Sequence, residues 1–207
     1  MKVLHFGDVH CSVDALKKLT RKARELDYDV VAVHGDVECD GEILALIEEL
    51  GSTILFVPGN MDDVSISKLY RGKGYNIDGC LREIKGYLFC GIGGLSVRSS
   101  LSSIKQKLEE MRETGKLQSS RLVILAHHPP RAEKVDLALG RIHAGLVELR
   151  NLILKYNPIA YLHGHIHEAP GYEVIGNTLI VNAGSLRSGS YALVDLENKR
   201  AEIRKLG

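Results

Sequence analysis

Five short motifs place aspartate, histidine or asparagine directly after apolar runs of the sequence. They are Asp8-Val9-His10, Gly35-Asp36, Gly59-Asn60-Met61-Asp62, His127-His128-Pro129-Pro130 and Gly164-His165-Ile166-His167. Carboxylate, amide and imidazole groups are donors that suit divalent transition metals, and such a site does not require cysteine. Alternate side chains of an extended segment point to the same side. Asp8 and His10 would therefore lie on one side of the chain, and so would His165 and His167. The motifs predict a metal site with seven donors: Asp8, His10, Asp36, Asn60, His127, His165 and His167.

Seven donors are more than one metal ion needs. Two ions that share a bridging carboxylate would use the whole set, and two-metal sites are common in the hydrolysis of phosphoryl esters. We therefore expect two divalent transition metal ions. Manganese, iron, zinc, nickel and cobalt all suit these donors, and the motifs do not choose among them.

The apolar runs before the motifs are typical of short strands that alternate with helices. Strands are expected over 2–6, 30–33, 53–57, 122–125 and 159–162, and helices over 13–26, 42–50, 65–70, 101–114 and 146–156. This rhythm predicts parallel strands with helical crossovers, whose carboxyl ends meet along one edge of a sheet. The remaining strands are expected in a hairpin over 81–90 and in a β-rich C-terminal part, over 171–175, 178–181, 191–196 and 201–205.

Length, composition and charge narrow the class of protein. The chain has 207 residues, which suits one domain over 1–207, and 27 basic against 26 acidic residues give a net charge of +1. This balance is not typical of a dedicated nucleic-acid surface. No apolar run approaches the roughly 18 residues of a membrane span, and the early Asp8 does not fit a secretion signal.

The cysteines contain no C-x-x-C pair, so a zinc knuckle or a thioredoxin-type site is not indicated. They are Cys11, Cys39, Cys80 and Cys90. We expect free thiols in a reducing compartment, and hence a cytoplasmic protein.

The order D-x-H, G-D, G-N-x-D, H, G-H-x-H resembles the calcineurin-like metallophosphoesterase superfamily. The resemblance extends from Asp8 to Asn182-Ala183-Gly184-Ser185 and is closest to small stand-alone prokaryotic members. It implies an α/β fold, a four-layer sandwich of two mixed β-sheets flanked by helices, with metals at the C-terminal ends of strands. It also implies that one metal is bound by Asp8, His10 and His167, the other by Asn60, His127 and His165, and that Asp36 bridges them.

The chain departs from the superfamily pattern at Met61, where G-N-H-D or G-N-H-E is usual. That histidine is generally assigned to the transition state and to protonation of the leaving oxygen, and methionine has no proton to donate. The resemblance therefore implies a phosphoric ester hydrolase that favours phosphodiesters over monoesters. The attacking group would be a hydroxide held between the metals. No side chain is assigned as the catalytic residue, and His128 is a candidate for assisting the reaction.

Several other residues near the motifs are candidates for a role in the site. His128 is an alternative to His127 as a ligand, although the end of the strand favours His127. Asp62 matches the superfamily position and is expected to orient a neighbour of the ligands. Arg98, in a segment rich in glycine and serine, is a candidate phosphate contact or an ordinary surface arginine.

Function has two leading hypotheses. The first is the binuclear phosphoesterase acting on a small phosphoester, and the alternative is a weakly active or inactive scaffold of the same fold that binds proteins. Methionine at position 61 is compatible with the scaffold hypothesis, whereas a complete set of metal ligands argues against it. A nuclease is a third hypothesis, which the near-neutral charge balance disfavours. The sequence does not determine the oligomeric state.

Overall fold

The computed structural model describes residues 1–51, 53–118, 121–139 and 141–207. The first sheet has the order β13-β12-β1-β2-β3. Its strands are β1 (Lys2–Phe6), β2 (Val30–Val33), β3 (Ile54–Phe56), β12 (Ser190–Asp195) and β13 (Arg200–Lys205). The three N-terminal strands run parallel and the two C-terminal strands pair antiparallel, so the sheet is mixed.

The second sheet has the order β10-β11-β9-β6-β5-β4 and is also mixed. Its strands are β4 (Leu81–Ile84), β5 (Tyr87–Ile92), β6 (Leu122–Ala126), β9 (Ala160–His163), β10 (Gly171–Ile175) and β11 (Thr178–Asn182). The four central strands, β5, β6, β9 and β11, are parallel, and each edge strand is antiparallel to its neighbour.

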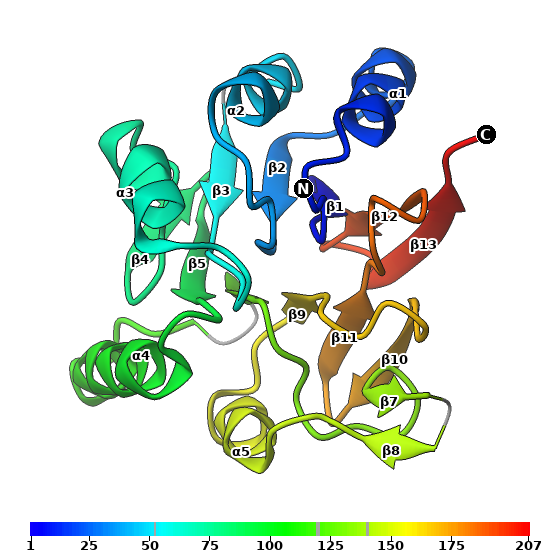
Figure 1. Cartoon of the computed structure of the whole chain (residues 1–207). Helices are drawn as coiled ribbons and strands as arrows, with labels where there is room; N and C mark the ends of the chain where they lie inside the picture. Colours follow the sequence, from blue (N-terminus) through cyan, green and yellow to red (C-terminus); the bar gives the residue numbers. More distant parts are fainter. Residues whose placement is uncertain (52, 119–120, 140) are drawn as a thin grey trace.

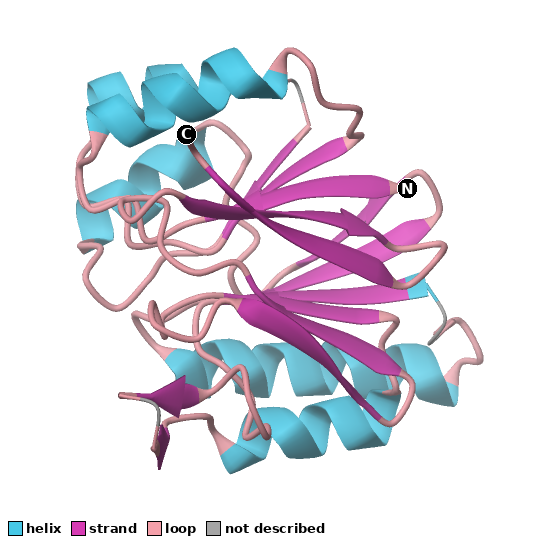
Figure 2. Ribbon diagram, turned by 90° about the vertical axis from the view of Figure 1, so that its right-hand side faces the viewer, coloured by secondary structure: helices cyan, strands magenta, loops and turns pink. Residues whose placement is uncertain are grey.

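Helices cover the outer face of each sheet, as Figure 1 and Figure 2 show. The first sheet carries α1 (Val13–Ala23), α2 (Gly41–Glu48) and α3 (Val64–Gly72), and the second carries α4 (Val97–Glu113) and α5 (Val147–Tyr156). Helix, sheet, sheet and helix follow one another in Figure 2. The predicted sandwich of two mixed sheets flanked by helices is confirmed.

Side chains of β1 show how the alternation of a strand builds these layers. Leu4 and Phe6 pack against the helices on the outer face, whereas Val3 faces the second sheet. The same division continues through the neighbouring strands, and it yields one apolar cluster between each pair of layers. Both sheets are thus held rigidly, and the loops at their common edge rest on a packed scaffold.

The parallel strands of both sheets end at this common edge. Backbone bonds fasten the loops there, from Asp8 N to Gly35 O (2.8 Å), from His127 N to Ile92 O (3.1 Å) and from Gly164 N to His127 O (3.2 Å). The loop after β1 is thus bound to the loop after β2, and the loop after β6 is bound to the end of β5 and to the loop after β9.

Helix α4 and a small hairpin differ from the sequence prediction. Helix α4 begins at Val97 rather than at residue 101, because the serines that predicted a loop continue the helix. The Ser100 N–H and hydroxyl both donate to Ser96 O, at 3.1 Å each. The small hairpin of β7 (Leu137–Ala138) and β8 (Ile142–His143) was not predicted, because its strands are too short to show a pattern.

The prediction of four free thiols is wrong for two of them. Cys11 follows β1 and Cys39 follows β2, and their sulfur atoms form a disulfide with the Cα atoms 5.2 Å apart. Cys80 and Cys90 are free. Within the described ranges, no helix combines the length and the apolar character required to cross a membrane.

Candidate metal centre

Three of the predicted donors gather around Nε2 of a fourth, His127. This atom lies 2.7 Å from Asn60 Oδ1, 3.1 Å from His165 Nδ1 and 3.5 Å from Asp36 Oδ2. The residues come from loops after β3, β6, β9 and β2. An amide oxygen, a carboxylate oxygen and two imidazole nitrogens at such separations form a donor set for a transition metal.

The other donors form a second group beside the first. Nε2 of His167 lies 3.4 Å from Asp8 Oδ1 and 3.4 Å from His10 Nε2. Asp8 and Asp36 also lie with His127 in a group whose ligand atoms are all within 4.8 Å of one another. The structure thus brings all seven predicted donors together, in two groups connected by these two carboxylates.

Asp8 provides the clearest test of whether a cation fits. Its Oδ2 accepts hydrogen bonds from His34 Nε2 (3.0 Å) and from the N–H of His165 (2.9 Å). Its Oδ1 is buried and has no hydrogen-bond partner among the described residues. Burial by itself would raise the pKa of Asp8, but His34 and His167 hold it well below its usual range. A buried, ionised oxygen whose nearest polar neighbour is another donor of the same group, Nε2 of His167 at 3.4 Å, is what a metal ligand presents.

Two histidines are oriented by a hydrogen bond at the nitrogen that faces away from the centre. Nδ1 of His127 donates to the carbonyl of His34 at 2.8 Å, and Nδ1 of His10 donates to Oε1 of Glu38 at 2.7 Å. Both bonds leave Nε2 with its lone pair toward the centre, which is the usual arrangement behind a metal-bound imidazole. Glu38 was not assigned this role from the sequence, because it matches no strict motif position.

Asp62 organises the loops that carry Asp36 and Asn60. Its carboxylate accepts four backbone N–H bonds at 2.8–2.9 Å. The donors are Asp36, Val37, Glu38 and Gly59. The side chain is 3% exposed. Asp62 therefore joins the loop after β2 to the loop after β3.

Asp36 lies where three carboxylates crowd together. Its Oδ1 accepts the N–H of Met61 at 2.8 Å. Burial, with the nearby charges of Asp8 and Asp62, raises the pKa of Asp36 to about 7. A cation between these groups would reverse the shift, because an opposite charge favours the ionised carboxylate.

Two glycines permit the close approach of these loops. A Cβ atom at Gly59 would lie 1.9 Å from Asp36 Oδ1, and one at Gly164 would lie 2.0 Å from His34 Nε2. Neither position has space for a side chain. The backbone of Asp8, His10 and Asp36 is left-handed, with φ of 48°, 46° and 50°. Such conformations in non-glycine residues are concentrated at functional sites.

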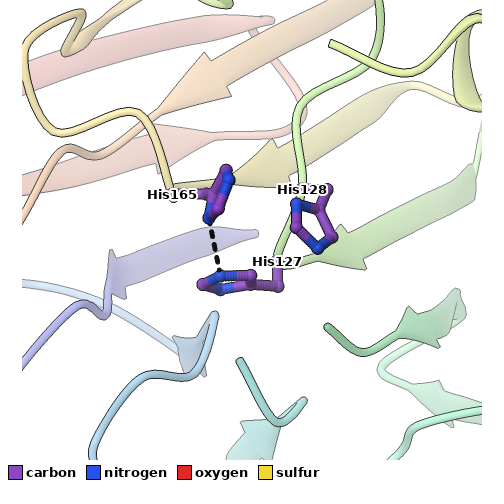
Figure 3. Close-up of side chains that lie close together, drawn as sticks. All are labelled: His127, His128 and His165. Carbon is purple, nitrogen blue, oxygen red and sulfur yellow. Dashed lines mark hydrogen bonds between the residues drawn. The ribbon is translucent and has the colours of Figure 1, made fainter. Parts of the chain in front are cut away.

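His128 lies beside the group around His127, as Figure 3 shows. Its ring meets that of His165 edge to face, with the centroids 4.3 Å apart, and it lies 5.0 Å from the ring of His127. Burial, and then the nearby His165, lower the pKa of His128 to about 4. The imidazole is therefore neutral at neutral pH, and it is placed to donate or accept one hydrogen bond at the edge of the centre.

Arg98 is not drawn into the cluster. It is exposed in the first turn of α4, rather than in a loop, and among the described residues its side chain makes no hydrogen bond or ion pair. The preceding loop does approach the centre, because a Cβ at Gly94 would lie 2.8 Å from Cδ2 of His127. Met61 is 60% exposed, and it lies beside Asp36 because its backbone N–H donates to Asp36 Oδ1.

The chain is similar in sequence and in fold to several known proteins. A model of the calcineurin-like phosphoesterase superfamily domain matches residues 1–199. Protein MJ1162 of Methanocaldococcus jannaschii is 31% identical over 200 residues, which cover 88% of this chain and 87% of that protein. Protein TT1561 of Thermus thermophilus has a similar solved structure, with a TM-score of 0.79, 20% identity, and coverage of 100% of this chain and 99% of that one. An archaeal phosphodiesterase follows with a TM-score of 0.57, 17% identity and full coverage of both chains.

Proposed function

The chain belongs to the calcineurin-like phosphoesterase superfamily, and from this we propose that it hydrolyses phosphodiesters with two divalent transition metal ions. The observation that carries the proposal is the convergence of the seven donors around Asp8 and Asp36. The buried oxygen of Asp8 without a hydrogen-bond partner supports a resident cation. The name of the archaeal phosphodiesterase is consistent with this substrate class.

The ligands divide between the two ions as the two groups of side chains suggest. Asp8, His10 and His167 would hold one ion, and Asn60, His127 and His165 the other. Asp36 would contact both. Bound metals would supply a hydroxide nucleophile at neutral pH and positive charge for the phosphoryl oxygens.

The protein's own groups would hold this centre in place. His34 and Glu38 keep the ligands Asp8 and His10 in fixed orientations, and Asp62 fixes the loop of Asp36. His128 would offer a neutral imidazole to a phosphoryl or leaving oxygen. Arg98, which lies in the first turn of α4, stays a candidate phosphate contact.

The residue at position 61 supports the proposed preference for phosphodiesters over phosphomonoesters. It occupies the position beside Asp36 where the superfamily usually has a histidine, and its thioether cannot protonate a leaving oxygen. Esters with weakly basic leaving groups would depend least on that proton. The same proposal treats residues 1–207 as one domain, and a cytoplasmic location stays a prediction.

The direct test is metal analysis combined with an activity panel. The purified protein, reconstituted with Mn²⁺ or Co²⁺, should bind two ions per chain and cleave aryl phosphodiesters faster than aryl phosphomonoesters. Asp36→Asn should reduce the affinity for both ions, because its carboxylate would serve both. Asp14→Asn, an exposed acid in the first turn of α1, is the matched control. A single bound ion would contradict the two-metal centre. An Asp36→Asn protein that keeps the wild-type affinity for both ions would contradict the shared role of Asp36.

A protein-binding scaffold is the second candidate, favoured only by Met61. It would be supported by a protein that binds two metals and hydrolyses none of the diesters, monoesters or nucleotides in the panel. The extent of the donor set supports hydrolysis, because a binding scaffold has no physical need for it.

A further inference from the structure

The disulfide adjoins the metal centre directly. Cys11 follows His10 in the chain, and Cys39 follows Glu38, the residue that accepts the hydrogen bond from His10 Nδ1. The covalent bond and the hydrogen bond therefore connect the same two loops at neighbouring positions. His10 is held from its backbone side by the disulfide and from its ring by the carboxylate.

The backbone at this junction is in a conformation that needs support. His10, Cys11 and Glu38 are left-handed, with φ of 46°, 57° and 60°. The N–H of His10 donates to Asp36 O at 2.9 Å and that of Cys11 to Val37 O at 3.1 Å. Non-glycine residues keep such conformations only where the surroundings hold them firmly, so each link between the loops contributes.

The two groups of donors differ in their dependence on this junction. His10 and Asp8 belong to the loop that the disulfide ties. His127 and His165 belong to loops after β6 and β9, which are fastened by His127 N to Ile92 O and by Gly164 N to His127 O. Loss of the disulfide would therefore affect the His10 group and leave the His127 group in place.

We propose that Cys11–Cys39 is a redox-sensitive clamp on the metal site formed by Asp8, His10 and His167. The inference rests on the metal centre proposed above. A dithiol reductant would supply two electrons and two protons: its thiolate attacks one sulfur, the S–S bond breaks, and a mixed disulfide forms. Its second thiol then closes the reductant's own disulfide and leaves Cys11 and Cys39 as thiols. Both cysteines are partly exposed, so a small dithiol can reach the bond.

Reduction releases the covalent link and lets His10 and Glu38 move apart. Loss of the groups that orient a metal-bound histidine typically lowers metal affinity by about 10- to 100-fold. We expect a decrease of this size at the His10 site and no change at the His127 site. The clamp would thus make occupancy of one of the two metal positions depend on the thiol–disulfide balance.

The first measurement is the state of the cysteines. Protein purified without reductant and alkylated after denaturation should show two free thiols, those of Cys80 and Cys90, and all four cysteines should react after treatment with dithiothreitol. Four free thiols before reduction would overturn the proposal.

The second measurement is Co²⁺ binding by calorimetry under anaerobic conditions, after removal of the dithiothreitol. One of two binding steps should weaken by about 10- to 100-fold in the reduced protein and in the double variant Cys11→Ser/Cys39→Ser. His10→Ala should lose that step and no longer respond to reduction. Cys80→Ser, which removes a free thiol, is the control. Equal affinities before and after reduction, or tighter Co²⁺ binding by the reduced thiols, would overturn the clamp.

A third measurement separates this proposal from the metal centre itself. In the metal-free protein, reduction should speed amide hydrogen exchange at Cys11, Val37 and Glu38, and leave His127 and Gly164 unchanged. If no metal binds to the oxidised protein, the proposed function fails, while exchange still reports on the clamp. Unchanged exchange at Cys11 after reduction would overturn the clamp whatever the metal content. Reduced wild-type protein serves the same test if the double variant does not fold.

Discussion

Nε2 of His34 lies 3.0 Å from Oδ2 of Asp8, and solvent reaches neither side chain. The carbonyl of His34 also accepts the hydrogen bond from Nδ1 of His127 at 2.8 Å. One buried residue at the end of β2 thus contacts Asp8 through its ring and His127 through its backbone. These two are proposed to bind different metals, so His34 connects the two halves of the centre.

Replacing His34 tests the contribution of the side-chain contact. His34→Leu removes the imidazole donor that the buried Asp8 carboxylate accepts from, and leaving a buried acceptor without its partner typically costs about 1–3 kcal/mol, more for a charged group. His34→Gln keeps an N–H donor and should cost clearly less. Urea unfolding of the metal-free proteins measures both free energies. Equal losses for the two variants would mean that packing of the ring, rather than its hydrogen bond, is what matters.

Asp62→Asn should be strongly destabilising. An amide has one acceptor oxygen in place of two and cannot satisfy four N–H groups, and buried unsatisfied donors cost about 1–3 kcal/mol each. We expect a loss of about 3 kcal/mol or more in the free energy of unfolding, with weaker metal binding.

Asp63→Asn is the matched control for that prediction. Asp63 is exposed and caps α3 by accepting from the N–H groups of Ser65 and Ile66. Asparagine caps helices about as well as aspartate, so the change should stay within about 0.5 kcal/mol. Similar losses for the two variants would show that Asp62 has no special role in joining the loops.

Stability should fall in acid partly because of His5. Burial, and then the nearby His34, lower the pKa of His5 to about 3, whereas the unfolded chain titrates near its usual 6.5. Unfolding therefore takes up a proton throughout this window. The contribution of His5 is fully present above about pH 6.5 and is lost as the pH falls toward 3, by up to about 1.4 kcal/mol per pH unit.

His5→Gln isolates this contribution, because glutamine does not titrate and its amide can donate to one of the two carbonyls that His5 contacts. Unfolding free energies of the metal-free proteins at several values between pH 7 and pH 4 are compared. The variant should show a shallower loss with falling pH. Parallel pH profiles would mean that His5 is not kept neutral in the folded protein.

Met61→His tests the origin of the proposed preference for diesters. A departing alkoxide is a strong base, and a positioned general acid typically contributes about 10²–10⁴-fold. The wild type should show a steep dependence of rate on leaving-group pKa, and an imidazole at the exposed position 61 should flatten it. Shallow and equal slopes would show that another residue, such as His128, already supplies the proton.

Much of the candidate site could be read from local sequence. Each donor follows an apolar run that forms a strand for local reasons, and parallel strands present their carboxyl ends at one edge. This is why Asp8, Asp36, His127 and His165 could be expected together without knowledge of the side-chain geometry. The order of the motifs then indicated the superfamily and the two mixed sheets.

Other contacts depend on how neighbouring strands are aligned in the sheet. Cys11 and Cys39 are separated by 28 residues, and nothing in that spacing marks them as partners. Phe6 lies opposite Val33 in the parallel register of β1 and β2, so the loops that follow start level and run side by side. The hydrogen bond from His10 to Glu38 arises from the same alignment. Sequence patterns determine where strands end because alternation and turns are local, whereas register depends on the packing of whole strands, and register decides which loop residues meet.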